Sequence, residues 1–489
     1  MSRHLFAQLS RESFIYGLSA AASRLVGLVL VPVYTRALTQ ADFGVLELLT
    51  TGMGILSSLL ILGLDNATAL RFYATEDARQ RKMIASAFLY FEAALTSAVC
   101  AVLFVLAPHI AAWLFADEAY SVYVRLAAAV VPFSTLVTLF LDVSRLVRRP
   151  WRYLTISVGN LVLTAALIVV AVALGLGLEG VLAATLAGNM AFVAVGWLLT
   201  REYYAGTFSF GVLSDMLALG LPVVPATVAY WVISFSNRWF LYHMQSPDQV
   251  ALLALATRLA APVVLVVTAF QIAWVPFSLS IARQSAAGHV YARTLSYFLA
   301  ATLGVLLLLV VLREPLILLF STPAYLPAGQ VLAIVGSSII AYGAYYIVAT
   351  GVNLAGQTAH IGWTTVVAAI VSITLNLLLI PVLGFAGAAT AGLAANLTAV
   401  ALLYTVAQRV YPLPYNLPQV SLLAAAGAAC MGLATLVHTG DLIVDLLLRV
   451  CVLAGFALAL ASLGVVRSAH LREAARLMRG VLGRTGTRP

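Results

Sequence analysis

The stretch that decides the fold is FIYGLSAAASRLVGLVLVPVYTRAL, Phe14–Leu38, which is followed by the short polar turn TQADFG. Its apolar length is enough to cross a bilayer as a helix, which rises about 1.5 Å per residue. Arg24 lies near its middle, and placing a guanidinium in lipid costs at least about 2.5 kcal/mol. We therefore expect Arg24 to face protein or water, which indicates a membrane protein with a polar interior.

Composition supports the same class. The chain has 489 residues, of which 63% are hydrophobic and only 9% are charged, whereas about a quarter of the residues in a soluble domain are charged. The three cysteines lie in apolar runs and the seven histidines show no ligand spacing. We expect an integral, all-α, polytopic membrane protein without a disulfide framework, a metal site or a cofactor.

Fourteen apolar segments can be marked along the chain, with ends that are uncertain by a few residues. They predict about fourteen transmembrane helices joined mostly by short loops. The predicted spans are 14–36, 43–64, 84–107, 121–143, 153–174, 178–200, 213–236, 249–272, 291–312, 328–350, 361–383, 386–408, 417–438 and 443–466.

The distribution of basic residues predicts the topology. With the N-terminus in the cytoplasm, 20 of the 27 Lys and Arg residues fall on the cytoplasmic side, six of them in the C-terminal tail. This is a strong positive-inside signal, and it explains the net charge of +9 without nucleic acid. Both termini are then cytoplasmic, and the basic tail is expected to lie on anionic lipid. The five residues assigned to the outside are Arg36, Arg125, Arg238, Arg313 and Arg449.

An internal repeat divides the chain. GLEGVLAATLAGN at 177–189 aligns without gaps to GFAGAATAGLAAN at 384–396, an offset of 207, and TQADFGVLEL aligns with QSPDQVALLA, placing Asp42 over Asp248 at an offset of 206. Two matches in one order predict two pseudo-symmetric six-helix lobes around a central cavity. The expected divisions are an N-lobe at 1–208, a C-lobe at 209–411, two further helices at 412–466 and a basic tail at 467–489.

Several motifs carry a family resemblance. SRLVGLVLVPVYTRALTQADFGVLELL, GLDNATALRFY, SNRWFLYHMQSPDQVALLALATRL and NLLLIPVLGFAGAATAGLAAN occur in order over about the first 410 residues. They resemble the polysaccharide transporter (oligosaccharide flippase) family of the multidrug/oligosaccharidyl-lipid/polysaccharide exporter superfamily. Asn237 stands where that family commonly has an acidic residue. The resemblance implies alternating access and transport of polyprenyl-diphosphate-linked sugars across the bacterial cytoplasmic membrane. Within the superfamily, the lipid II flippase branch is similar to this chain in having fourteen spans.

Arginines within spans are the candidate substrate ligands. A guanidinium binds diphosphate oxygens bidentately, so Arg24 and Arg258 are predicted to hold a lipid diphosphate, with Arg71 at the inner mouth. The alternative is that each arginine neutralises an intramembrane carboxylate or caps a carbonyl. For Arg71 the alternative is a role in topology and anionic-lipid contact.

Carboxylates within or at the ends of the predicted spans are the candidate ion-coupling groups. Glu92 is predicted to lie deepest, with Glu47 and Asp65 nearer the helix ends, and a desolvated carboxylate can take a proton or Na⁺. The alternative is a salt bridge with Arg24.

Rival functions remain open. A drug or organic-cation antiporter of the same superfamily would favour an acidic cavity, and a membrane glycan polymerase or ligase would be expected to have a long outer loop with catalytic residues. The sequence favours a transporter that is not an enzyme. Its expected partners are the lipid-linked glycan, membrane lipids and glycan-assembly enzymes.

Overall fold

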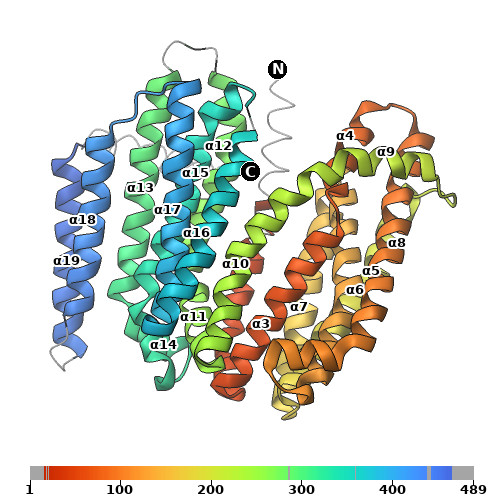
Figure 1. Ribbon diagram of the computed structural model, residues 1–489, viewed down its shortest axis with the longest axis horizontal. Coiled ribbons are helices and arrows are strands. Elements are labelled where there is room, and N and C mark those ends of the chain that lie inside the picture. Colours follow the sequence, from red (N-terminus) through yellow and green to blue (C-terminus); the bar gives the residue numbers. More distant parts are fainter. Residues whose placement is uncertain are drawn as a thin grey trace, which may run out of the picture. The chain divides into compact units, whose positions relative to one another are not determined.

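The computed structural model describes residues 16–464, except 18, 20, 283, 285, 286, 358 and 438–441. Within this part every regular element is a helix, as predicted (Figure 1). The α-helices are α2 Val31–Ala37, α3 Gln40–Leu60, α4 Leu64–Ala74, α5 Ala78–Phe115, α6 Ser121–Leu146, α7 Pro150–Ala173, α8 Gly177–Thr200, α9 Phe210–Gly220, α10 Val224–Met244, α11 Pro247–Leu259, α12 Ala261–Ile281, α13 Ala287–Val311, α14 Arg313–Phe320, α15 Leu332–Leu354, α16 Ala359–Leu383, α17 Phe385–Val410, α18 Leu417–Leu436 and α19 Leu442–Ser462. The 3₁₀ turns are η1 Glu118–Tyr120, η2 Arg201–Tyr203, η3 Leu221–Val223 and η4 Pro323–Gln330.

Ten helices in the described part are long and apolar enough to cross a membrane. The pair α11 and α12, which is bent by 51°, passes the same test as an eleventh span. The first expected span begins in residues 14 and 15, outside the described residues, and fourteen spans therefore stays a prediction. The basic tail from Arg467 also lies outside the described residues.

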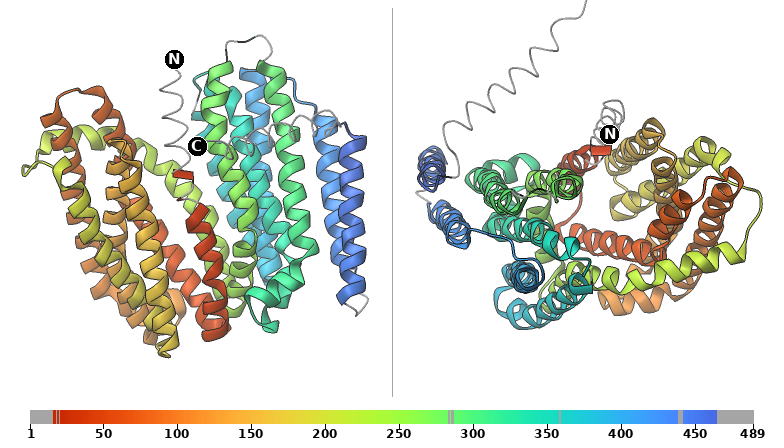
Figure 2. Two further views of the ribbon diagram at one scale, coloured as in Figure 1. Left: turned by 180° about the vertical axis from the view of Figure 1, so that it is seen from behind. Right: turned by 90° about the horizontal axis from the view of Figure 1, so that it is seen from above.

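Two compact units form along the chain. Among the described residues, the first comprises 16–261, 317–331 and 362–395, and the second comprises 262–316, 332–361 and 396–464. In the first unit α6 packs against α5, α7 and α8, and α3 packs against α11. In the second, α13 packs against α15 and α18, and α18 runs beside α19 (Figure 2).

The helices α3 and α11 have matching N-terminal caps at positions 207 residues apart in the sequence. The Thr39 hydroxyl accepts the Asp42 N–H at the start of α3, and the Ser246 hydroxyl accepts the Gln249 N–H at the start of α11. Such side chains satisfy N–H groups that have no partner within the helix. Gly177 and Gly384, at φ +57° and +56°, stand at the starts of α8 and α17. The caps place Thr39 over Ser246, so the sequence alignment of Asp42 with Asp248 is displaced by one position.

Glycine permits the closest approach between α3 and α11. A Cβ atom built on Gly44 would overlap the carbonyl oxygen of Pro247 in the first turn of α11. The backbone of α11 cannot move aside as the end of a flexible side chain can. Any residue larger than glycine at position 44 must therefore push α3 and α11 apart. These two helices carry the acidic and basic members of the site described below.

Gly44→Ala is expected to destabilise the protein by about 1–3 kcal/mol, the usual cost of overpacking a close contact. Gly52→Ala on the same helix is the matched control, because a Cβ there meets nothing within 4 Å. It is expected to be neutral or to stabilise by up to about 1 kcal/mol, since alanine favours helix more than glycine does. Thermal unfolding of both variants in detergent compares them, and equal melting temperatures would contradict the close contact.

The predicted span at 213–236 is wrong in its bounds. α9 lies across the end of α4 and α5, and the chain turns through η3 into α10, which runs to Met244 (Figure 1). Pro222 within η3 interrupts regular helix hydrogen bonding, and Gly63 and Gly220 permit contact between the backbones of the two segments. Apolar length alone does not reveal such a turn.

Candidate functional site

A carboxylate and two guanidinium groups form a cluster in the first unit. Glu47 on α3 accepts hydrogen bonds from Arg238 on α10 at 3.2 Å and from Arg258 on α11 at 2.9 Å. The side chains are 11%, 16% and 24% exposed, respectively. We call Glu47, Arg238 and Arg258 the ion triad. Ion pairs with this little exposure have larger effects on stability than those at the surface.

Aromatic rings cover one side of the ion triad. The Arg258 guanidinium carbon lies 5.4 Å from the centre of the Tyr34 ring and 5.1 Å from that of Phe43. Tyr34 and Phe43 are themselves stacked, and both are buried. Ring faces attract a cation, and a planar guanidinium can lie against them while its edge donates hydrogen bonds. Arg258 is therefore held in one orientation from two directions.

Local structure explains how these side chains meet. Arg258 lies in the last turn of α11, where the helix dipole favours a cation, and the chain bends immediately afterwards into α12. Glu47 lies two turns into α3, on the buried segment that packs against α11. One carboxylate therefore accepts hydrogen bonds from two guanidinium groups. Arg258 is the more exposed of the two, and a guanidinium has further N–H groups with which to bind an anion.

Arg24 lies on the helical segment before α2, in the first unit. It is exposed, and it makes no ion pair with any residue in the described part of the chain. Ser19 on the preceding turn is hydrogen-bonded to Ser157 of α7 at 2.5 Å, and the Tyr16 ring packs edge-on against Tyr153. These contacts hold the segment against α7, while the Arg24 guanidinium remains available to a ligand.

Arg71 is brought together with a different residue. Its guanidinium on α4 lies 3.4 Å from the Asp215 carboxylate on α9, so the ion pair joins these two helices. Both side chains are well exposed. An exposed pair contributes little to stability. The structure therefore shows an ion-pair partner for Arg71 that the sequence did not predict, and this partner is not one of the other candidate residues.

Glu92 has surroundings different from those of the ion triad. Its side chain on α5 is fully buried, and neither carboxylate oxygen has a hydrogen-bond partner among the described residues. Asp65 lies in the first turn of α4, the helix that packs against α5. A buried carboxylate without a partner must bind a proton or a cation, because leaving the bare charge out of water costs many kcal/mol. The alternative for Glu92, a salt bridge with Arg24, is not among the ion pairs of the described residues.

Two further arginines were not among the predicted site residues. Arg238, which the predicted topology assigns to the outside, is a member of the ion triad. Arg449, which is assigned to the same side, lies within α19, is 1% exposed, and donates to Glu314 at 2.9 Å and to the Val437 carbonyl at 2.8 Å. Asp445, four residues earlier on the same helix, was the available signal, because (i, i+4) charges of opposite sign commonly pair.

Solved structures share this fold. The lipid II flippase MurJ in an inward closed conformation matches with a TM-score of 0.72 and 13% identity, covering 91% of this chain and 98% of that chain. An inward-facing multidrug resistance MATE transporter of the MOP superfamily matches with a TM-score of 0.58 and 15% identity, covering 83% and 96%. A MOP superfamily transporter from Pyrococcus furiosus matches with a TM-score of 0.59 and 15% identity, covering 85% and 96%. Comparison with curated protein sequences gave no match.

The helices and these likenesses define a multi-pass membrane protein with the MurJ and MATE transporter fold. The sequence profile of the family described as polysaccharide biosynthesis protein matches residues 9–282. That match spans more than half of the chain, and the chain belongs to this family. The expected fold class and family are confirmed, and the structural neighbours are transporters and flippases.

Proposed function

We propose that this protein is a flippase that moves a polyprenyl-diphosphate-linked oligosaccharide across the bacterial cytoplasmic membrane, with both termini in the cytoplasm. Membership of the polysaccharide biosynthesis family and the fold shared with a lipid II flippase support this function. Alternating access between two six-helix halves is the proposed mechanism. Inward-facing and outward-facing forms of MATE transporters with this fold support it.

The partly exposed guanidinium of Arg258, held in a fixed orientation, is the observation that carries the proposal. Arg258 keeps about a quarter of its side chain exposed while Glu47 and the aromatic rings fix its orientation. A diphosphate carries negative charge and several acceptor oxygens, and charge-assisted bonds to guanidinium groups are strong and directional. Arg24 supplies the second substrate contact in this proposal, and Arg71 receives the headgroup at the cytoplasmic side.

Ion coupling is assigned to the acidic groups. Glu92 takes up and releases the coupling ion, and Asp65 tunes its charge from the neighbouring helix. The burial of Glu92 and its two unpaired oxygens support this role. Glu47, the third candidate, is already bound to two arginines, so its contribution is to hold Arg258 rather than to exchange an ion.

Glu92→Gln is expected to abolish the stimulation of transport by an imposed pH gradient while leaving downhill exchange active. The amide matches the carboxyl in shape but cannot gain or lose a proton. Reconstituted vesicles with and without a pH gradient give the measurement. Glu179→Gln, at an exposed carboxylate on α8, is the control and keeps the stimulation. If Glu92→Gln responds to the gradient as the wild type does, Glu92 is not the coupling group.

Transbilayer movement of a fluorescent polyprenyl-diphosphate sugar in reconstituted vesicles tests the function directly. Faster movement than in protein-free vesicles is expected, and a non-phosphorylated polyprenyl sugar should not compete. The same vesicles loaded with a fluorescent organic cation test the antiporter alternative. Export of the cation without movement of the lipid-linked sugar would overturn the flippase. Glycan-assembly enzymes on the cytoplasmic side are the proposed partners.

A further inference from the structure

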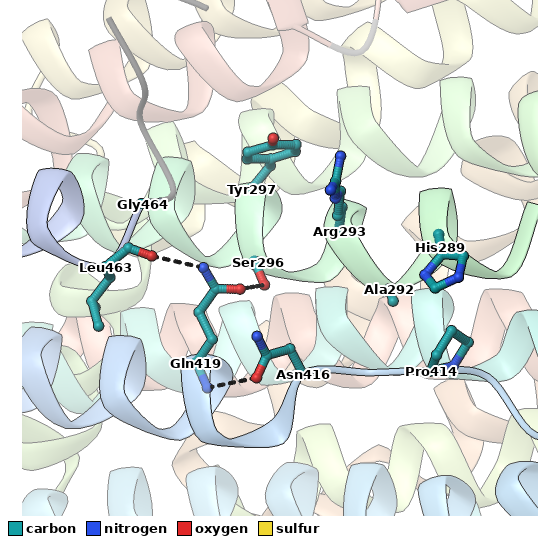
Figure 3. Close-up of a pocket in the computed structure, with 10 residues that line it drawn as sticks. All are labelled: His289, Ala292, Arg293, Ser296, Tyr297, Pro414, Asn416, Gln419, Leu463 and Gly464. Atoms are coloured by element: carbon teal, nitrogen blue, oxygen red, sulfur yellow. Dashed lines mark hydrogen bonds between the residues drawn. The ribbon is translucent and has the colours of Figure 1, made fainter. Parts of the chain in front are cut away.

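A polar cavity of about 460 Å³ lies in the second unit, and its lining includes neither the ion triad nor Glu92 (Figure 3). It is bounded by the first turns of α13, by the start of α18 and by the segment that follows α19. Gln419 closes one side, where its amide donates to the Leu463 carbonyl at 3.0 Å and its oxygen accepts from Ser296 at 3.3 Å (Figure 3). These bonds connect all three elements, so the cavity has a fixed wall.

A stripe of side chains on α13 faces this cavity. His289, Arg293 and Tyr297 follow one another at intervals of four residues, which places them on the same side of the helix. Arg293 is exposed and makes no ion pair among the residues that the structure describes. None of the ten residues that line the cavity is acidic. Among the described residues, the Arg293 guanidinium therefore faces the cavity without a counter-ion.

Hydrogen-bond donors complete the lining. Asn416 uses its oxygen to accept the Gln419 N–H at 3.2 Å and so caps α18, which leaves its NH₂ group as a donor at the cavity (Figure 3). Together with the Arg293 guanidinium and the His289 ring, these groups match the oxygens of a phosphate. A phosphate diester has more acceptor oxygens than a carboxylate. A guanidinium and an amide around one cavity can donate to more of these oxygens, so the cavity fits a phosphate diester better than a carboxylate ligand.

We infer that this cavity binds the phosphate of an anionic phospholipid headgroup, separately from the transported substrate. Tyr297 is 44% exposed on α13, and tyrosines of this kind are enriched at the interface between lipid and water. Leu422 on α18 and Leu458 on α19 are 55% and 72% exposed, which provides apolar helix surface for acyl chains. The expected topology places this end of α13 on the cytoplasmic side, where anionic lipids attract basic groups.

Lipid retention by purified protein tests the site. The full-length protein is equilibrated with vesicles of equal parts phosphatidylglycerol and phosphatidylcholine, extracted, and the bound phosphatidylglycerol is counted by native mass spectrometry. Arg293→Gln is expected to weaken retention about tenfold, the loss from one charge-assisted hydrogen bond. Arg409→Gln is the matched control, because Arg409 is an exposed arginine of the same unit outside the cavity. It is expected to retain lipid as the wild type does.

A second arm separates the lipid from a free anion. Inorganic phosphate at millimolar concentration should not displace phosphatidylglycerol if the acyl chains contribute to binding. Displacement by phosphate, equal retention in Arg293→Gln and wild type, or an equal loss in Arg409→Gln would each overturn the inference. The readout does not require transport, so failure of the flippase assay would leave this result standing.

Discussion

Glu47→Ala is expected to destabilise the protein by about 3–5 kcal/mol, because it removes the carboxylate that pairs with two poorly exposed guanidinium groups. Removing one partner of a buried ion pair destabilises a protein by more than the intact pair stabilises it, because the remaining charge is neither paired nor hydrated. Here one substitution affects both Arg238 and Arg258. Unfolding of the purified protein in detergent, followed by tryptophan fluorescence against denaturant, measures the loss.

Two further variants isolate the cause. Glu47→Gln keeps an acceptor oxygen but removes the charge, so we expect a smaller loss of stability. Asp215→Ala breaks the exposed pair with Arg71 and should change stability little. If Glu47→Ala unfolds at the same denaturant concentration as Asp215→Ala, the ion triad has no special importance for the fold.

Features that depend on local sequence were predictable. The glycines at 177 and 384 and the polar residues at 39 and 246 each mark a helix start, because left-handed backbone and capping hydroxyls are short-range requirements. Apolar length predicted the helices themselves. Charged positions within spans also identified Glu47, Glu92 and Arg258 as unusual, since an intramembrane charge must have a reason.

Features that depend on distant residues were not predictable. Glu47 meets Arg238 and Arg258 across 191 and 211 positions of sequence, and no periodicity connects residues so far apart. The lateral course of α9 depends on contact between two glycine backbones, at 63 and 220, rather than on hydropathy. The sequence therefore singled out Glu47 and Arg258 as candidates but did not reveal that they pair with each other or that Arg238 joins them.

This difference separates the two arginines that are proposed to bind the substrate. Arg258 is bound to Glu47 and lies against two rings, so replacing it would alter folding and ligand binding together. Arg24 is exposed and has no described ion-pair partner, although its segment is held against α7. A substitution at Arg24 can therefore report on transport without the loss of stability that follows from breaking the ion triad.

Arg24→Ala is expected to lower the transbilayer movement of a polyprenyl-diphosphate sugar by about 100-fold. Two charge-assisted hydrogen bonds to the diphosphate, each changing affinity by about tenfold or more, account for that loss. Initial rates in reconstituted vesicles give the measurement, with the amount of inserted protein matched between samples. Arg24→Lys is expected to recover only part of the rate, since an ammonium keeps the charge but not the bidentate geometry.

The unfolding curve and a second arginine distinguish this role from a structural one. Arg24→Ala should unfold as the wild type does, because no described ion pair is broken. Arg79→Ala removes an equally exposed arginine from the first turn of α5 and should leave the rate unchanged. Wild-type transport by Arg24→Ala would remove this residue from the substrate site. The partly exposed guanidinium of Arg258 would then be the principal remaining anion contact, and Arg258→Lys would become the decisive variant.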